Sequence, residues 1–200
     1  MARDNQHGER GRRRVQLSAD LVIETAATIV DSEGIEALSL TRVAKDLGTS
    51  QPALYRHLDG YDALIRALGL RSREILAGRL AAAAVGLARE DAVRAMGVAW
   101  RRMVQDHPGI YAATDRYPVA GDPELEAAID QIVATLGQAL IGFDLAEDEV
   151  VHVARTLRSA FHGFSHLEAG VGFPLKQDLD DSFDRLLELL CTGIRTLGQA

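Results

Sequence analysis

Residues 38–58 read LSLTRVAKDLGTSQPALYRHL, and this stretch predicts two short helices joined by a tight turn. Ser39 is placed to cap the first helix, and Gly48 ends it because glycine adopts the left-handed C-terminal conformation without steric cost. Ser50 is placed to cap the second helix, and Pro52 lies in its first turn, where a missing N–H costs little. The residues expected to face inward are Leu40, Val43, Ala44, Leu47, Leu54 and Leu58.

The second of these helices presents mixed side chains to the outside. A short helix that projects hydrogen-bonding groups from its N-terminal end is typical of a helix-turn-helix that enters the major groove of DNA. The plainer interpretation is a helical hairpin whose polar residues face solvent. The side chains left to point outward or sideways are those of Gln51, Ala53, Tyr55, Arg56 and His57.

The spacing of this segment also resembles a known family. Leu47-Gly48, then Gln51-Pro-Ala-Leu-Tyr-Arg-His57, then Tyr61-Asp-Ala-Leu64, are similar to the DNA-binding domain of the tetracycline-repressor (TetR) family of transcriptional regulators. The resemblance runs from about Leu17 to about Leu68. It implies an all-α protein: an N-terminal helix-turn-helix domain of three helices, and a larger helical bundle that binds a small molecule and forms a dimer.

The resemblance, combined with the chemistry of base edges, gives the expected DNA contacts. Gln51 suits a bidentate contact to adenine, Arg56 suits guanine or a phosphate, and Pro52 and Ala53 offer apolar contact to a thymine methyl group. Tyr55 and His57 match family positions that usually hold DNA phosphates. Tyr61 stands where many relatives carry lysine. The expected set on the folded domain is Thr41, Arg42, Ser50, Gln51, Pro52, Ala53, Tyr55, Arg56, His57 and Tyr61.

Charge is distributed unevenly along the chain. Residues 1–14 hold five arginines against two acidic residues, a local net charge of +3, which leaves −10 for the rest of a chain whose net charge is −7. We expect these residues to be disordered, either as an inert tail or as a basic arm that reaches phosphates or the minor groove through Arg12, Arg13 and Arg14. The acidic remainder argues against non-specific DNA binding over the whole surface.

Helical periodicity continues to the C-terminus, and no stretch alternates like a half-buried strand. We therefore expect a DNA-binding domain over residues 15–65 and a ligand-binding and dimerisation domain over residues 66–200. Asp122-Pro123-Glu124 is a strong helix start: a cap, then proline in the first turn, then an acid near the positive end of the helix dipole. The expected helices cover residues 18–34, 61–79, 89–106, 110–115, 122–140, 147–169 and 180–197.

Aromatic residues concentrate in the second domain, where eight of the ten lie at or after Trp100. They predict an apolar cavity with a few polar groups, suited to an apolar or aromatic ligand. The alternative is that these side chains only fill the core, which is the commoner role of aromatic residues at helical spacing. The candidate lining residues are Trp100, Met103, Tyr111, Tyr117, Phe161, His162, Phe164 and His166.

One segment of that domain suggests a subset of the family. Phe161-His162-Gly163 resembles a Trp-His-Gly signature on the penultimate long helix, with phenylalanine in place of tryptophan. His162 and His166 share a helix face, but Gly163 stands where a zinc-peptidase motif needs glutamate, and no cysteine or acid cluster completes a ligand set. We therefore expect no metal and no cofactor.

Small and apolar residues near the C-terminus predict the dimer interface. Gly163 and Gly170 allow a second helix to approach closely, and the last helix has a broad apolar face suited to a four-helix interface. The expected interface residues are Gly163, Gly170, Phe183, Leu187, Leu190 and Ile194.

Composition narrows the function. The chain has one cysteine, Cys191, no apolar signal segment and no uninterrupted apolar span, so we expect a cytoplasmic protein without a membrane partner. The first hypothesis is a dimeric repressor that a small effector releases from a palindromic operator. An enzyme would need a nucleophile–base set or a metal site, and no catalytic residue can be identified. A third hypothesis is a structural DNA-binding protein, which a filled core rather than a cavity would favour.

Overall fold

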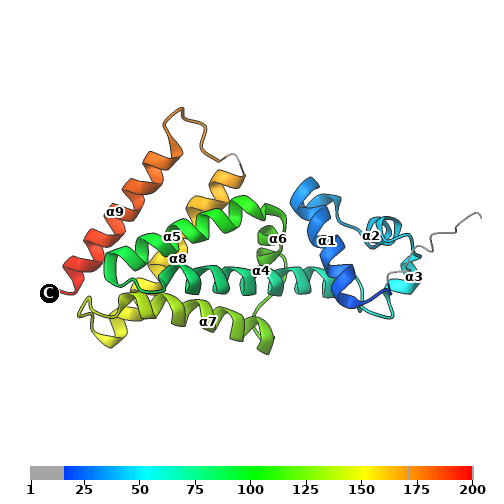
Figure 1. Ribbon diagram of the computed structural model, residues 1–200, viewed down its shortest axis with the longest axis horizontal. Helices are drawn as coiled ribbons and strands as arrows, with labels where there is room; N and C mark the ends of the chain where they lie inside the picture. The colour runs from blue at the N-terminus through cyan, green and yellow to red at the C-terminus, as the bar shows by residue number, and fades with distance from the viewer. Residues whose placement is uncertain (1–15, 171, 200) are drawn as a thin grey trace, which may run out of the picture.

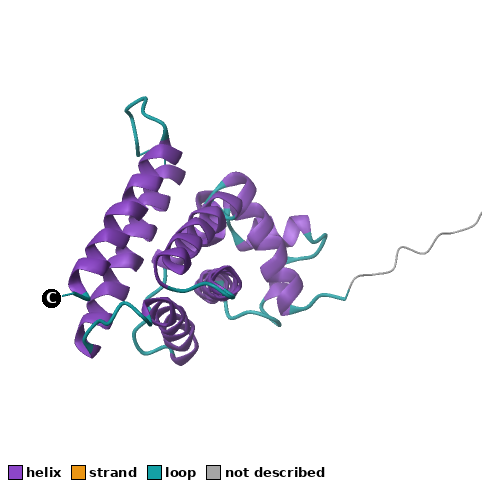
Figure 2. Ribbon diagram, turned by 60° about the vertical axis from the view of Figure 1, so that its left-hand side comes forward, coloured by secondary structure: helices purple, strands orange, loops and turns teal. Residues whose placement is uncertain are grey.

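Helices make up all the regular structure that the computed structural model describes, which covers residues 16–170 and 172–199 (Figures 1 and 2). The all-α prediction is confirmed for this part of the chain. The basic arm, with Arg12, Arg13 and Arg14, lies outside the described residues.

The N-terminal elements are α1 (Ala19–Glu33), the 3-10 turn η1 (Ile35–Ala37), α2 (Leu40–Asp46) and α3 (Gln51–Leu54). Side chains cap α1 and α2, since Ser18 accepts from the amide of Leu21 and Ser39 from that of Arg42. Gly48 follows α2 with φ 63°, the left-handed conformation expected of it. The core of this unit includes Val22, Ala26, Val43, Ala44 and Leu54, all buried.

Two details of the helix-turn-helix differ from the prediction. The second helix has one regular turn, Gln51–Leu54, followed by turn residues through His57, so it is shorter than expected. Ser50 stands at its N-cap position but makes no capping hydrogen bond through its side chain. Leu47 and Leu58 are only half-buried, because they lie at the ends of these short elements.

A single long helix, α4 (Tyr61–Ala84), connects the two parts of the molecule. It begins beside the helix-turn-helix and runs into the centre of the C-terminal bundle, between α5 and α7 (Figure 1). The boundary expected near residue 65 therefore falls inside a continuous helix, and no flexible linker separates the two parts.

The C-terminal bundle consists of α5 (Arg89–Asp106), α6 (Pro108–Ala112), η2 (Ala113–Asp115), α7 (Pro123–Leu140), α8 (Glu147–Ala169) and α9 (Leu179–Leu197). Asp122 caps α7 by accepting from the amide of Leu125, as its sequence predicts. The last helix packs against α5 and α8. The largest fully buried side chains of the bundle include Phe161, Phe183, Met96, Met103 and Leu136.

The two parts meet where α6 packs against α1. A Cβ atom built on Gly109 would lie 2.0 Å from the carbonyl oxygen of Val30, so only glycine permits this approach. One carboxylate oxygen of Asp31 accepts hydrogen bonds from the amides of Gly109 and Ile110, both at 2.9 Å. The other oxygen lies 2.9 Å from Nδ1 of His107. Asp31, on α1, thus satisfies the free N–H groups at the start of α6.

We expect Gly109→Ala to destabilise the protein by about 1–3 kcal/mol, because the added methyl group collides with rigid backbone rather than with a movable side chain. Urea unfolding followed by circular dichroism measures the change.

The matched control is Gly78→Ala, in α4, where an added Cβ meets nothing within 4 Å. Alanine there should stabilise the helix by about 0.5–1 kcal/mol. If both variants are equally stable, the α1–α6 contact is not as rigid as the structure indicates.

Candidate nucleic-acid interface and pocket

The outward side of the helix-turn-helix carries the side chains expected to contact DNA. Tyr55, Arg56 and His57 are exposed, and Tyr61 is 41 % exposed at the first residue of α4. α2, α3 and the start of α4 lie together at the end of the molecule remote from α9 (Figure 1). The exposed members of the predicted DNA-contacting set therefore lie at one end of the molecule.

Gln51 is held by a neighbour on the preceding helix. The hydroxyl of Thr41 lies 3.1 Å from Oε1 of Gln51 and donates to it. The amide group of Gln51 keeps its two N–H donors and one acceptor lone pair for another partner. Thr41 therefore orients Gln51, a role that the sequence analysis did not assign to it.

Arg42 is already engaged within the domain. Its guanidinium makes two hydrogen bonds to Glu33, at 2.9 and 2.5 Å, and one to Asp46 at 3.0 Å. These hydrogen bonds raise the pKa of Arg42 above its usual range, with Glu33 the largest cause. Arg42 thus joins α1 to α2, whereas Arg56 takes part in no ion pair of the described residues.

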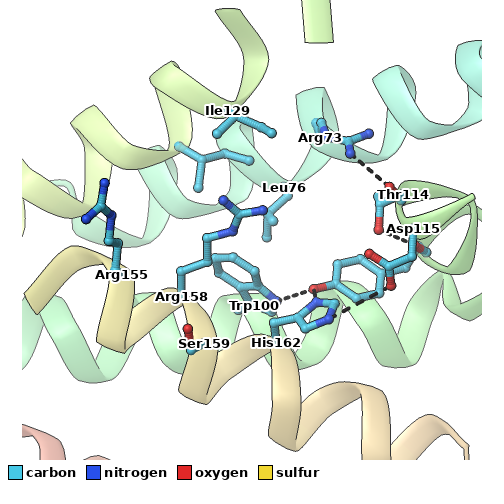
Figure 3. A pocket seen from close by; sticks show the side chains of 12 residues that line it. Arg73, Leu76, Trp100, Thr114, Asp115, Ile129, Arg155, Arg158, Ser159 and His162 are labelled. Atoms are coloured by element: carbon cyan, nitrogen blue, oxygen red, sulfur yellow. Dashed lines mark hydrogen bonds and ion pairs between the residues drawn. The ribbon is translucent and has the colours of Figure 1, made fainter. Parts of the chain in front are cut away.

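A cavity of about 420 Å³ lies among α4, α5, η2, α7 and α8 (Figure 3). Its apolar wall consists of Leu76, Trp100, Ile129 and Ile132. Its polar wall consists of Arg73, Tyr111, Thr114, Asp115, Arg155, Arg158, Ser159 and His162. The pocket therefore combines one apolar side with an unusually polar one.

A chain of hydrogen bonds crosses the floor of the pocket. Nε1 of Trp100 donates to the hydroxyl oxygen of Tyr111 at 2.9 Å, and that oxygen lies 2.7 Å from Nδ1 of His162. Burial raises the pKa of the Tyr111 hydroxyl and lowers that of His162. Burial therefore favours the neutral form of both groups.

The structure brings together only some of the predicted lining residues. Trp100, Tyr111 and His162 line the cavity. The others do not, because they pack elsewhere. Met103 and Phe161 are fully buried in the core, Phe164 packs against Phe173 and Phe183, Tyr117 is half-buried against the core, and His166 is exposed and stacks on His162.

The sequence analysis did not identify the arginines that line the pocket. Arg155 and Arg158 are spaced i, i+3 on the face of α8 that also carries His162. Arg73 falls on the apolar stripe of α4 formed by Ile65, Leu68, Leu76 and Leu80, and a charged residue inside such a stripe is a detectable signal.

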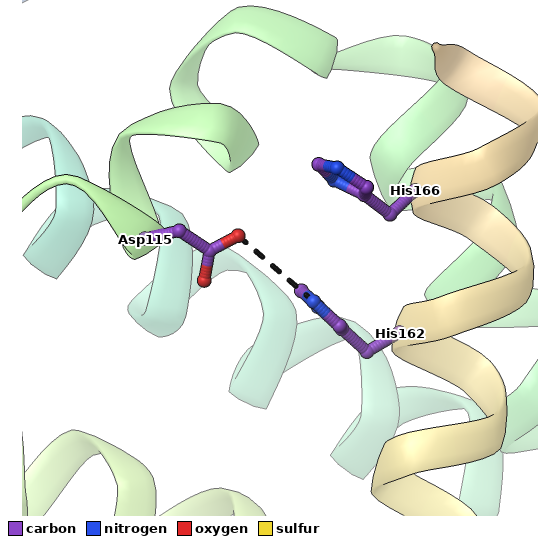
Figure 4. A group of neighbouring side chains, drawn as sticks. All are labelled: Asp115, His162 and His166. Atoms are coloured by element: carbon purple, nitrogen blue, oxygen red, sulfur yellow. Dashed lines mark ion pairs between the residues drawn. The ribbon is translucent and has the colours of Figure 1, made fainter. Parts of the chain in front are cut away.

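Asp115, His162 and His166 form a second cluster beside the pocket (Figure 4). Their donor atoms all lie within 4.8 Å of one another, and Nε2 of His162 is 3.9 Å from Oδ2 of Asp115. Two imidazoles and a carboxylate are a possible set of ligands for a transition metal. The sequence analysis found no acid near the two histidines because Asp115 comes from a distant turn. The neighbouring positive charge of Arg158, which also lowers the pKa of His162, opposes a cation here.

The predicted dimer interface needs correction. Phe183, Leu187 and Ile194 are buried within the protomer, and Leu187 contacts Gly97 of α5 closely. This apolar face of α9 packs against α5, and ion pairs from Arg94 to Glu188 and from Arg101 to Asp180 join the same two helices at the surface. The exposed large apolar side chains on α8 and α9 are instead Val151, Leu167, Leu189 and Leu197, and Leu189 is 72 % exposed.

These two helices also form an apolar groove of about 150 Å³. Gly163 lies in α8 with open space beyond its Cα, and Gly170 ends that helix. Leu190 is half-buried. The groove is lined by Val153, Thr156, Leu157, Leu189, Leu190, Gly193, Ile194 and Leu197.

A helix-turn-helix joined by a continuous helix to a bundle with a cavity defines a DNA-binding transcriptional regulator. Residues 22–68 match the family described as bacterial regulatory proteins, tetR family, and residues 93–190 match the family described as Tetracyclin repressor-like, C-terminal domain. The chain belongs to the TetR family, whose members are transcriptional regulators rather than enzymes.

Relatives support this assignment along most of the chain. The HTH-type transcriptional regulator Rv0681 of Mycobacterium tuberculosis is 34% identical over 183 residues, which are 91% of this chain and 84% of the relative. The crystal structure of the regulatory protein SCO4313 is 26% identical with a TM-score of 0.72, covering 92% of this chain and 98% of that one. BioQ with its double-stranded DNA operator is 25% identical with a TM-score of 0.66, covering 88% of this chain and 99% of that one. The Trp-His-Gly subset stays a prediction.

Among the described residues, no helix is long and apolar enough to cross a membrane.

We expect Tyr111→Phe to cost about 1–3 kcal/mol of stability, because it leaves the buried Trp100 N–H without an acceptor. Urea unfolding measures the loss, and the emission of Trp100 should change because its hydrogen bond is gone.

Tyr117→Phe is the control, since the hydroxyl of this half-buried residue has no hydrogen bond to the described residues. It should change stability by less than about 0.5 kcal/mol. Equal losses for the two variants would contradict a structural role for the hydrogen-bond chain.

Proposed function

We propose that this protein is a homodimeric, cytoplasmic repressor that a small effector releases from a palindromic DNA operator. One observation carries the proposal. The segment 107–115 forms part of the pocket wall through Tyr111 and Thr114, and it also holds α1 of the DNA-binding unit through Gly109. The description of the matching C-terminal family as repressor-like supports the repressor mode. A ligand-independent DNA-binding protein of the same fold is the alternative.

In the proposed mechanism, the effector acts on the junction between the two parts. A ligand that fits only one arrangement of Tyr111 and Thr114 moves α6 and η2. Because Gly109 lies directly against the backbone of α1, that movement shifts α3, the recognition helix proposed to enter the major groove, relative to its counterpart in the dimer. The shift in equilibrium equals the difference in the ligand's affinity for the two states.

Filling the pocket tests this coupling without knowledge of the effector. The operator is first obtained by selection from random double-stranded DNA and by footprinting upstream of the protein's own gene. Ile129→Trp, on the pocket wall, should change operator affinity at least tenfold, which needs about 1.4 kcal/mol of coupling.

Ala134→Trp places the same ring on the exposed side of α7 and should leave operator affinity unchanged. Circular dichroism establishes that both variants are folded. If folded Ile129→Trp binds the operator like the original protein, the pocket is not coupled to DNA, and the ligand-independent alternative is favoured.

For base recognition we propose Gln51, oriented by Thr41, and the unpaired Arg56, with Ser50, Pro52, Ala53, Tyr55, His57 and Tyr61 positioning the duplex. Gln51→Ala and Arg56→Ala should each weaken operator binding by about 1–3 kcal/mol more than binding to random DNA, because base contacts carry specificity. Fluorescence anisotropy with both DNAs measures the difference.

Thr41→Val separates orientation from contact. It removes the hydroxyl that holds Gln51 and should reproduce part of the specificity loss of Gln51→Ala. A Gln51→Ala variant that loses the same affinity for operator and random DNA does not read bases.

For dimerisation we propose the exposed apolar groove of α8 and α9, with a second copy of the chain as its occupant. Leu189→Glu and Leu197→Glu should produce monomers, because a carboxylate in an apolar interface is costly to desolvate. Two recognition helices in the dimer would then lie about 34–36 Å apart to match successive major grooves. Analytical ultracentrifugation measures the assembly state.

Leu175→Glu is the control, since this 76 % exposed residue lies in the loop before α9, outside the groove. Leu187→Glu is unsuitable, because Leu187 is buried in the protomer and the variant should unfold. Dimers that persist in both groove variants place the interface elsewhere.

A further inference from the structure

The charge of the pocket is unbalanced. Three arginines line it, Arg73, Arg155 and Arg158, and Asp115 is its one carboxylate. Burial lowers the pKa of His162, which disfavours a positive charge on the imidazole. The cavity wall therefore carries an excess of positive charge within a chain whose net charge is −7.

These arginines differ from most others in the protein. Elsewhere in the described residues, arginines pair with acids, as Arg66 does with Asp122 and Arg101 does with Glu168. The described arginines without an ion pair are Arg56, Arg73, Arg102, Arg155 and Arg158. Three of these line one cavity, with Arg73 buried and Arg155 and Arg158 exposed at its edge.

Arg73 is the least expected of them because it is only 7 % exposed. Its guanidinium donates to the carbonyl oxygens of Gly69 and Thr114, both at 2.9 Å, which satisfies hydrogen bonds but supplies no negative charge. Burial, and secondly the positive charge of Arg158, lower its pKa from the usual range, yet an arginine remains protonated at pH 7. Asp115 and Asp122 are near enough to act on this charge, but no carboxylate of the described residues forms an ion pair with it, so an anion in the pocket would offset the cost of burying it.

The placement of the side chains defines the shape of that anion. Figure 3 shows Arg155 and Arg158 extending from α8 and Arg73 from α4, with the ring of Trp100 beneath. Ile129 and Ile132 of α7 complete an apolar wall opposite. A ligand that fills the space needs a negative head between the guanidiniums and an apolar body beside the indole.

We propose that the effector is an organic acid: a carboxylate bound between Arg73 and Arg158, with an apolar body against Trp100. This inference rests on the proposed function only in calling the ligand an effector, since binding can be measured without DNA. It revises the expectation of a mainly apolar ligand with neutral polar groups.

Direct binding tests the proposal with a matched pair of probes. Decanoate and decanol have the same chain length and differ in charge. Calorimetry below the micellar concentration should show decanoate binding at least tenfold more tightly than decanol, with a change in Trp100 emission. Inorganic phosphate should bind much more weakly than decanoate, because it has no apolar body.

Variants locate the charge preference. In Arg73→Met and Arg158→Met the preference for decanoate over decanol should fall below threefold, while decanol binds as before. Arg102→Met removes another unpaired arginine, outside the pocket, and should leave the preference intact. Arg158→Met should also raise the melting temperature of the ligand-free protein, because it relieves repulsion of Arg73. If Arg158 only stabilised the fold, Arg158→Met would instead lower the melting temperature.

Three results would overturn the proposal: decanol binding as tightly as decanoate, phosphate binding as tightly as decanoate, or a decanoate preference that survives in folded Arg73→Met and Arg158→Met. If the proposed function is wrong instead, decanoate would bind as described but leave operator affinity unchanged.

Discussion

The contact between Gly109 and the backbone of α1 is the constraint on which the relation between the two parts of the protein depends. A Cβ atom at this position would lie 2.0 Å from a carbonyl oxygen, so α6 cannot slide or rotate against α1 without losing the fit. Asp31 adds two hydrogen bonds to the first amides of α6. Because packed interfaces of this kind switch between arrangements rather than deforming continuously, a small displacement of α6 becomes a displacement of the DNA-binding unit.

Local signals made much of the fold predictable. Ser39 and Asp122 cap the helices that their sequences indicated, since capping depends on a few adjacent residues. The helix-turn-helix was predictable for the same reason, and its family resemblance was specific in spacing. The length of α3 was not predictable, because a single helical turn depends on its packing against α2 more than on its own sequence.

Properties that depend on distant contacts could not be predicted. The apolar stripe of α9 identifies a buried face, but periodicity does not say whether Leu187 packs in its own protomer or in a partner; that depends on the space that Gly97 of α5 leaves for it. Likewise, Trp100, Tyr111 and His162 of the predicted set line a cavity, but the aromatic pattern gave no indication of its charge. Arg73 and Arg158 stand on helices far apart in sequence and meet only in the folded bundle.

The charge of the pocket and the rigidity of the junction act on the same segment. Arg73 is bonded to the carbonyl of Thr114 in η2, which directly continues α6, and to that of Gly69 in α4. A negative ligand would draw Arg73 and Arg158 toward itself and change how firmly Arg73 holds Thr114. A neutral ligand of the same shape lacks this effect. A ligand with equal affinity for both states shifts nothing, so the charge of the ligand would act as the source of differential affinity that regulation requires.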